Sequence, residues 1–161
     1  MTTFGKLCLF ATVAFAAAAS IHTTNLVQFG DMIQCLTERS FLTSFLDYEG
    51  YGCWCGIGGK GTPLDGTDEC CMIHDRCYDA VMAGGRCPLD EYVYIAVYIT
   101  SKYDCKSPNA RVTFARAEDY GYFSPWPYCR EAVCQCDRAA AECFVANAFD
   151  TTYTNWDKDI C

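Results

Sequence analysis

The stretch CCMIHDRCY, residues 70–78, places a histidine and an aspartate among three cysteines and a tyrosine. Cys70 and Cys77 are seven residues apart, which puts them two turns apart on one face of a helix. A second helical run contains another such pair, Cys136 and Cys143. If the two helices lie antiparallel, Cys77 can bridge Cys136. The same register brings Cys70 to Cys143, although spacing alone does not fix cysteine pairing. We therefore predict two long helices held side by side by disulfides.

His74 lies midway between Cys70 and Cys77. The antiparallel register places position 139 opposite it, which brings Asp137 within about half a turn. A histidine that faces a carboxylate across a rigid pair of helices suits a general base with its orienting partner. A histidine taken alone is more often a structural residue, but the flanking cysteines favour the functional interpretation.

Asp75 is rotated by about 100° from His74 on the helix and therefore faces a neighbouring surface. The stretch YGCWCGIGGKGTPLDG, residues 51–66, precedes this helix and is too rich in glycine for regular structure. Its backbone carbonyls and the Asp75 carboxylate would form a set of hard oxygen ligands. Such a set suits calcium (Ca2+) better than a transition metal.

The amino-terminal residues have the pattern of a secretory signal peptide. Lys6 is followed by an apolar run that is too short and too rich in alanine for a membrane span, and then by small residues suited to cleavage. We predict a signal peptide at residues 1–20, cut near 19–20, a possible short propeptide to residue 24, and one domain over residues 25–161. The mature protein is expected to be soluble, secreted and extracellular.

The composition indicates a disulfide framework and an acidic protein. The chain has 161 residues, 14 cysteines and a formal net charge of −8. Loss of the signal peptide removes Cys8 and Lys6, leaving 13 cysteines and a charge of −9 from 11 basic and 20 acidic residues. So many cysteines in a short exported chain favour disulfides over zinc sites, and the odd number leaves one thiol unpaired. The acidic balance argues against nucleic acid as a partner and against strong attraction to anionic membranes.

Three further segments have recognisable patterns. In NLVQFGDMIQCL, residues 25–36, apolar residues recur at helical spacing, and Asn25 with Gln28 would suit a capping box. Residues 89–98 are apolar and aromatic and suit either a short helix or a strand. Residues 110–123 suggest a hairpin followed by an aromatic loop.

Together these segments resemble the secreted phospholipase A2 family over nearly the whole mature chain. YGCWCGIGG resembles the calcium loop of that family, and CCMIHDRCY its first catalytic helix. CQCDRAAAECF resembles the second catalytic helix, and NLVQFGDMIQC the amino-terminal helix. The resemblance is specific, because several separate motifs agree in order and spacing. The terminal Cys161, suited to pairing with Cys53, is similar to the pancreatic and elapid subclass (group I).

The resemblance implies calcium-dependent hydrolysis of the sn-2 ester of glycerophospholipids at the surface of membranes or micelles, releasing a fatty acid and a lysophospholipid. It implies that His74 activates a water molecule. Asp137 would fix the imidazole tautomer, and Tyr78 would hydrogen-bond this aspartate.

The resemblance also implies a calcium site and an acyl channel. The Asp75 carboxylate would bind calcium together with the backbone carbonyls of Trp54, Gly56 and Gly58, and the ion would act as Lewis acid and template. The backbone N–H of Gly56 would complete the oxyanion site. The acyl channel would be lined by Leu26, Phe29 and Ile33.

Six disulfides are implied by the resemblance: Cys35–Cys105, Cys53–Cys161, Cys55–Cys71, Cys70–Cys143, Cys77–Cys136 and Cys87–Cys129. The family usually has a cysteine where Phe114 stands, and the partner position of that cysteine is Cys134. Cys134 is therefore the candidate unpaired thiol. It could be a buried inert thiol or a covalent link to a partner subunit, or the alignment could be wrong at this point. A buried thiol is favoured, because a cysteine on a packed helix behaves as a small hydrophobe.

The chain departs from the family at a tyrosine and at a loop. Counting back from Cys105 to the family's second network tyrosine reaches Ser101, and a small shift allows Tyr98 or Tyr103 to substitute. EDYGYFSPWPY, residues 118–128, is longer than the usual connection. Its aromatic residues could form a membrane-interface patch or contact a protein partner, or the loop could fold over its own core.

The predicted fold class is mostly α and disulfide-rich. It has two long antiparallel helices near residues 67–82 and 129–148, an amino-terminal helix, a calcium-binding loop and a small antiparallel β hairpin. The rival function is a non-enzymatic binding protein or toxin subunit on the same scaffold. The presence of His74, Asp75 and the three glycine-loop ligand positions favours the enzyme, whereas the odd cysteine keeps the partner-subunit version open.

Overall fold

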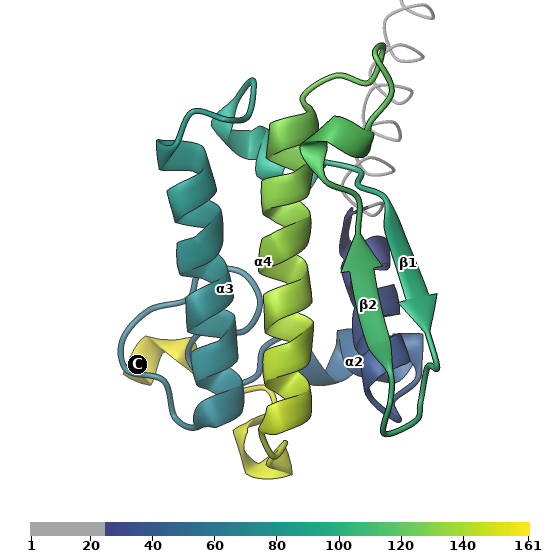
Figure 1. Ribbon diagram of the computed structural model, residues 1–161. Helices are drawn as coiled ribbons and strands as arrows, with labels where there is room; N and C mark the ends of the chain where they lie inside the picture. Colours follow the sequence, from purple (N-terminus) through teal and green to yellow (C-terminus); the bar gives the residue numbers. More distant parts are fainter. Residues whose placement is uncertain (1–24) are drawn as a thin grey trace, which may run out of the picture.

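Two antiparallel helices, α3 and α4, lie side by side at the centre of the protein (Figure 1). The computed structural model describes residues 25–161, where α3 spans Gly66–Ala83 and α4 spans Pro127–Ala146. The disulfides Cys70–Cys143 and Cys77–Cys136 join them, each with Cα atoms 5.7 Å apart. The prediction of two long helices stapled in antiparallel register is thereby confirmed. The predicted signal peptide, with its Cys8, lies outside the described residues.

The ends of the two helices follow from the local sequence. The Asp65 side chain accepts a hydrogen bond from the N–H of Asp68 at 2.8 Å and caps the start of α3. α4 begins at Pro127, whose fixed φ and missing N–H suit the first turn of a helix. Both helices start and end within two residues of the predicted boundaries.

The amino-terminal helix, residues 25–36, packs against both long helices through Phe29, which contacts His74 of α3 and Phe144 of α4, as the apolar spacing predicts. Its polar side chains bond to a distant segment rather than to their own helix end. The Asn25 amide donates to the carbonyl of Val93 at 2.9 Å, and the Gln28 amide donates to the carbonyl of Tyr98 at 2.6 Å. The predicted capping box is therefore wrong, because tertiary partners take both side chains.

The remaining elements are short. They are α2 (Phe41–Tyr48), η1 (Asp90–Tyr94), β1 (Thr100–Tyr103), β2 (Arg111–Phe114), η2 (Ala117–Asp119), η3 (Thr151–Tyr153) and η4 (Lys158–Ile160). The segment predicted as a short helix or strand contains the 3-10 turn η1. β1 and β2 form the predicted antiparallel hairpin, with Thr100 opposite Phe114. Its first strand lies upstream of the predicted region, because TSKY is polar and largely exposed and lacks the apolar alternation that marks a strand.

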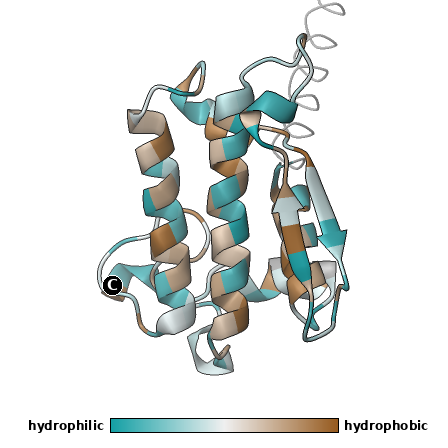
Figure 2. Ribbon diagram, viewed as in Figure 1, coloured by the Kyte–Doolittle hydropathy of each residue, from teal (hydrophilic) through white to brown (hydrophobic). Residues whose placement is uncertain are grey.

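The core lies where the long helices, the amino-terminal helix and η1 meet, and several cystines are part of it. Both α3 and α4 carry hydrophilic residues among hydrophobic ones along their length (Figure 2). The other four disulfides are Cys35–Cys105, Cys53–Cys161, Cys55–Cys71 and Cys87–Cys129, so all six pairs coincide with those implied by the resemblance. Each typically contributes about 2–4 kcal/mol of stability. Within residues 25–161, no helix is long and apolar enough to cross a membrane.

Candidate active site

His74 and Asp137 face each other between α3 and α4. Nε2 of His74 lies 2.7 Å from Oδ1 of Asp137. The Asp137 side chain is fully buried, whereas the His74 side chain is 15% exposed and can be reached from outside. The ring of Phe29 stacks on the imidazole, with centroids 4.8 Å apart and planes inclined by 16°. These contacts fix the ring and leave Nδ1 as the nitrogen that is free to take a proton.

Two tyrosines complete the hydrogen bonding of the Asp137 carboxylate. The hydroxyl of Tyr78 donates to Oδ1 at 2.7 Å, and the hydroxyl of Tyr98 donates to Oδ2 at 2.5 Å. Burial, and secondarily the charge of Asp137, raises the pKa of both tyrosines, so both remain donors at neutral pH. Tyr98 is thus the second tyrosine of this network. Tyr103 is instead exposed on β1, with the guanidinium of Arg111 4.4 Å from its ring.

Asp68, which the sequence analysis did not single out, anchors both ends of the glycine-rich loop. Its buried carboxylate accepts backbone N–H groups at 2.7–2.9 Å from Cys53, Trp54 and Leu64. A β-carbon on Gly52 would lie 2.4 Å from the Asp68 carboxyl carbon, so only glycine fits there. The disulfides to α3 and to the carboxyl terminus hold the loop at two further points.

Asp75 and the glycine-rich loop converge in front of Gly59. A β-carbon built on Gly59 would lie 2.9 Å from Oδ2 of Asp75 and 3.0 Å from the carbonyl oxygen of Trp54. Two oxygens from different elements therefore border one small space. Gly56 and Gly58 have positive φ angles of 89° and 80°, a backbone shape that side chains rarely allow. An oxygen-only set of this kind fits calcium.

Burial and several nearby charged groups act on the Asp75 carboxylate. Burial raises the pKa of Asp75, an effect opposed by the nearby charge of His74 and then reinforced by that of Asp79. Lys158 also opposes it, and its Nζ donates to the carbonyl of Ile57 in the glycine-rich loop at 2.9 Å. Among the described residues, no three or more His, Cys, Asp and Glu side chains cluster as metal ligands. Any calcium site here therefore depends on backbone carbonyls.

Comparison with known proteins identifies the family of the chain. The family model described as Phospholipase A2 matches residues 26–154. The chain belongs to the phospholipase A2 family. It is therefore an enzyme, a carboxylic ester hydrolase of a family that acts on lipid substrates at membranes.

Relatives of the phospholipase A2 family span nearly the whole chain. Phospholipase A2 AP-PLA2-II of Acanthaster planci is 42% identical, and the alignment covers 100% of each chain. AP-PLA2-I of the same organism is 39% identical over 93% of this chain and 94% of its own. Phospholipase A2 A2-hormotoxin-Apt1a of Adamsia palliata is 36% identical over 91% of this chain and 83% of its own.

The three residues expected in a phospholipase A2 acyl channel lie in different surroundings. Phe29 stacks on His74, Ile33 is buried, and Leu26 is half exposed at the start of the amino-terminal helix. The rings of Phe29 and Phe144 are neighbours, with centroids 6.4 Å apart, and the ring of Tyr48 stacks on that of Phe144, with centroids 4.1 Å apart. The sequence analysis missed the last two, because their proximity depends on how α2 meets the end of α4.

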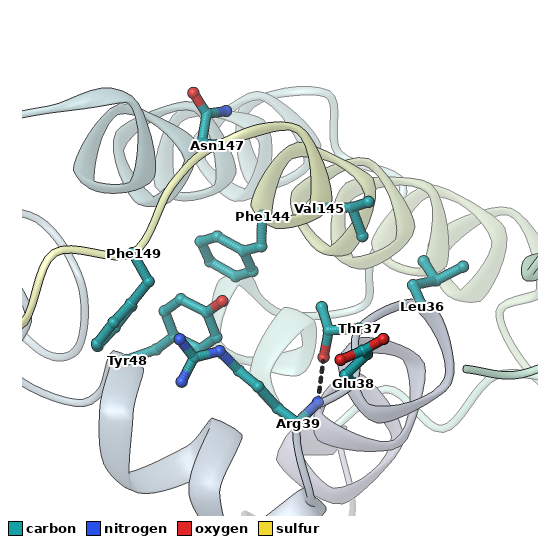
Figure 3. A pocket seen from close by; sticks show the side chains of 9 residues that line it. All are labelled: Leu36, Thr37, Glu38, Arg39, Tyr48, Phe144, Val145, Asn147 and Phe149. Atoms are coloured by element: carbon teal, nitrogen blue, oxygen red, sulfur yellow. Dashed lines mark hydrogen bonds between the residues drawn. The ribbon is translucent and has the colours of Figure 1, made fainter. Parts of the chain in front are cut away.

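These rings lead to a cavity of about 510 Å³ (Figure 3). Tyr48, Phe144 and Phe149 line one side of it. The Arg39 side chain extends along Tyr48 and Phe149, with its guanidinium carbon 4.2 Å from the Phe149 centroid (Figure 3). Arg39 also pairs with Asp47, so its charge is locally balanced.

Cys134 has no disulfide partner within residues 25–161 and is fully buried. Burial, and then the charge of Asp137, raises the pKa of its thiol. Phe114, which stands where the family usually has the partner cysteine, packs against the core beside Arg138 instead. The structure therefore favours the inert thiol over a covalent link to a partner.

Proposed function

We propose that the protein is a secreted, calcium-dependent enzyme that hydrolyses the sn-2 ester of glycerophospholipids at a lipid interface. The products would be a fatty acid and a lysophospholipid. The observation that carries the proposal is the pairing of His74 with Asp137 next to the convergent oxygens of Asp75 and Trp54. A general base and a hard-cation cradle on adjacent surfaces of one helix are the parts that ester hydrolysis needs.

His74 would act as the general base. Nδ1 would take the proton from the attacking water, while Asp137 holds Nε2 and stabilises the imidazolium that forms. Tyr78 and Tyr98 keep the Asp137 carboxylate fully hydrogen-bonded and in place. The stacking of Phe29 on the imidazole restricts rotation of the ring.

The glycine-rich loop would bind calcium. Asp75 would hold the ion through its carboxylate, and Trp54, Gly56 and Gly58 through their carbonyls. When bound, calcium polarises the ester carbonyl and holds the substrate phosphate. The N–H of Gly56 would donate to the oxygen that becomes negative. The acyl chain would lie along Leu26, Phe29 and Ile33, in the direction of Phe144.

The deciding experiment is the release of labelled fatty acid from phosphatidylcholine in mixed vesicles. Substrate labelled at sn-2 should lose its label in calcium and keep it in excess chelator, and substrate labelled at sn-1 serves as the positional control. His74→Gln should remove the release without altering the disulfides. Absence of release in calcium, from protein with six verified disulfides, would contradict the proposal and favour the binding-protein or toxin-subunit function.

Secretion is tested separately by expressing the full chain with its own leader. The proposed signal peptide at residues 1–20 and the domain at residues 25–161 predict that protein in the medium begins between residues 20 and 25. Chain retained in the cell with Met1 intact would contradict this part of the proposal. The observed terminus would also show whether residues 21–24 are a propeptide.

A further inference from the structure

The segment Tyr120–Tyr128, here called the aromatic loop, displays four large rings to solvent. Tyr122 and Phe123 are 96% and 94% exposed, and Tyr128 and Trp126 are 68% and 50% exposed. Of its five aromatic residues, only Tyr120 is buried. The loop therefore does not fold over its own core, which was one of the alternatives that the sequence left open. It projects beyond the start of α4 (Figure 1).

The exposed rings are carried by a loop with defined contacts at its base. The hydroxyl of Tyr120 accepts the N–H of Ile99 at 3.2 Å. The guanidinium carbon of Arg130 lies 5.6 Å from the Tyr120 ring, and Nη1 of Arg130 donates to the Ser124 hydroxyl at 2.7 Å. Trp126 has a positive φ of 55°, which is uncommon for a large side chain and is followed at once by the first turn of α4. These contacts hold the loop in an outward position.

The composition of the aromatic loop suits the headgroup region of a lipid surface that carries no net charge. The sequence YGYFSPWPY contains no charged residue, in a chain with 32 charged residues and a net charge of −8. Tyrosine and tryptophan prefer the headgroup region of a bilayer, where the ring is apolar and the polar atom remains hydrated. A net acidic protein gains little from anionic lipid. A neutral aromatic loop therefore suits a zwitterionic surface.

The loop is connected to other exposed apolar side chains by hydrogen bonds. Gln28 of the amino-terminal helix bonds to both the carbonyl and the N–H of Tyr98. The next residue, Ile99, bonds to Tyr120. Leu26 and Val27 of the helix are half exposed, as is Ile99. Three neighbouring segments thus present apolar side chains that the protein does not bury itself.

We propose that the aromatic loop is a lipid-contact surface that inserts Tyr122, Phe123 and Trp126 into the headgroup region of phosphatidylcholine membranes. This inference rests on the proposed function, because a lipid interface is where that substrate is found. A projecting loop suits a deformable bilayer, whereas a protein partner would have to supply a matching concave pocket. The loop would increase residence at the membrane and take no part in the chemistry at His74.

The test measures binding to vesicles of diether phosphatidylcholine, which has no ester to hydrolyse. The double variant Tyr122→Ala/Phe123→Ala should lower the partition coefficient by about tenfold or more, because two large rings lose their burial in lipid. The matched control, Leu89→Ala/Tyr103→Ala, removes two exposed apolar side chains outside the loop and should change partitioning by less than about twofold. Unchanged melting temperatures would verify that both double variants fold. Equal vesicle binding by both would overturn the proposal.

Tryptophan emission supplies an independent readout. Brominated phosphatidylcholine should quench the emission of the wild type, and Trp126→Phe should lose most of that quenching. Undiminished quenching in Trp126→Phe would overturn the proposal. Sedimentation gives a second possible contradiction. A wild type that is dimeric, with a Tyr122→Ala/Phe123→Ala variant that is monomeric, would also overturn the proposal, because the rings would then be buried against a second copy of the chain.

Hydrolysis of a dispersed short-chain phosphatidylcholine separates the two proposals. Vesicle binding that depends on the loop, in a protein that hydrolyses no monomeric lipid, would support the lipid contact and contradict the proposed function. Hydrolysis of monomeric lipid, in a protein whose vesicle binding is unchanged by the loop substitutions, would support the proposed function and contradict the lipid contact.

Discussion

The imidazole of His74 lies 2.7 Å from the carboxylate of Asp137, between two disulfides that already hold the helices together. On α3, Cys70 and Cys77 lie about one turn to either side of His74, and on α4 Asp137 lies between their partners Cys143 and Cys136. The register of α3 against α4 therefore does not depend on the imidazole. His74 is available for chemistry.

His74→Gln should abolish turnover and keep the fold. Loss of a general base typically costs about 10²–10⁴ in rate, and here it also removes the acceptor for the proton of the water. The melting temperature should change by only a few degrees, because the disulfides remain. Steady-state hydrolysis and calorimetry measure the two quantities. Unfolding of the oxidised variant would show that His74 is a structural residue.

Tyr78→Phe and Tyr98→Phe should each destabilise the protein by about 1–3 kcal/mol, because each leaves the buried Asp137 carboxylate short of one donor. Their effect on turnover should be smaller than that of His74→Gln, since neither hydroxyl touches the imidazole. Tyr103→Phe is the matched control and should change stability by less than about 0.5 kcal/mol. Denaturant unfolding with intact disulfides measures all three. A neutral Tyr98→Phe together with a destabilising Tyr103→Phe would contradict the assigned network.

The parts of the site that the sequence predicts are those fixed by helical spacing. Seven-residue intervals between cysteines become two turns on one helix face, and the same periodicity places His74 toward Asp137. Asp75 is predictable in the same way, since it follows His74 by one residue and the glycine-rich loop precedes the same helix.

The parts that the sequence does not predict depend on distant segments. Asp68 bonds to backbone N–H groups of a loop up to 15 residues away, and no periodic pattern marks it. Tyr98 follows η1 and reaches Asp137 of α4 across a separation of 39 residues, so counting back from Cys105 does not find it. Asn25 and Gln28 have the spacing of a capping box, yet nearby carbonyls of another segment are better placed.

Asp68→Ala should open the glycine-rich loop. Three backbone N–H groups would lose their acceptor, at a cost of about 3 kcal/mol or more in stability. The loop carbonyls would lose their positions, so calcium affinity should fall as well. Glu69→Ala removes the same charge from the exposed neighbouring residue and is the control. Calorimetric melting and calcium titration measure the effects, and equal values for the two variants would contradict the role of Asp68.

Gly59→Ala should weaken calcium binding, because the added methyl group would displace its neighbours, of which Cε3 of the Trp54 ring is the nearest at 2.7 Å. The added methyl group would stand about where Asp75 and Trp54 direct their oxygens, at 2.9 Å and 3.0 Å from them. We expect an affinity at least about tenfold lower in titration calorimetry, because a displaced ligand oxygen cannot reach the ion. Gly121→Ala adds the same methyl group where nothing lies within 4 Å and should leave affinity unchanged. Identical calcium affinities in both variants would place the ion elsewhere.

The buried thiol of Cys134 should make the protein less stable in alkali. Burial raises its pKa above the ordinary value of 9.0. Below about pH 9 the thiol keeps its proton in both states and contributes no pH dependence. Above that pH the unfolded chain releases the proton and the native chain does not. The unfolded state is then favoured by up to about 1.4 kcal/mol per pH unit.

Cys134→Ala should remove the pH dependence that comes from this thiol. As pH rises from about 9 to about 10, the free energy of unfolding of the wild type should therefore fall relative to that of the variant. Tyr78 and Tyr98 contribute in the same direction at higher pH and are common to both proteins, so they cancel in the comparison. Denaturant unfolding at each pH gives the slopes, and a chromogenic disulfide reagent reports access to the thiol. The native chain from residue 25 should resist the reagent and release one thiol once unfolded. Parallel stability curves, or rapid reaction of the native thiol, would contradict the inert role and restore the covalent link to a partner.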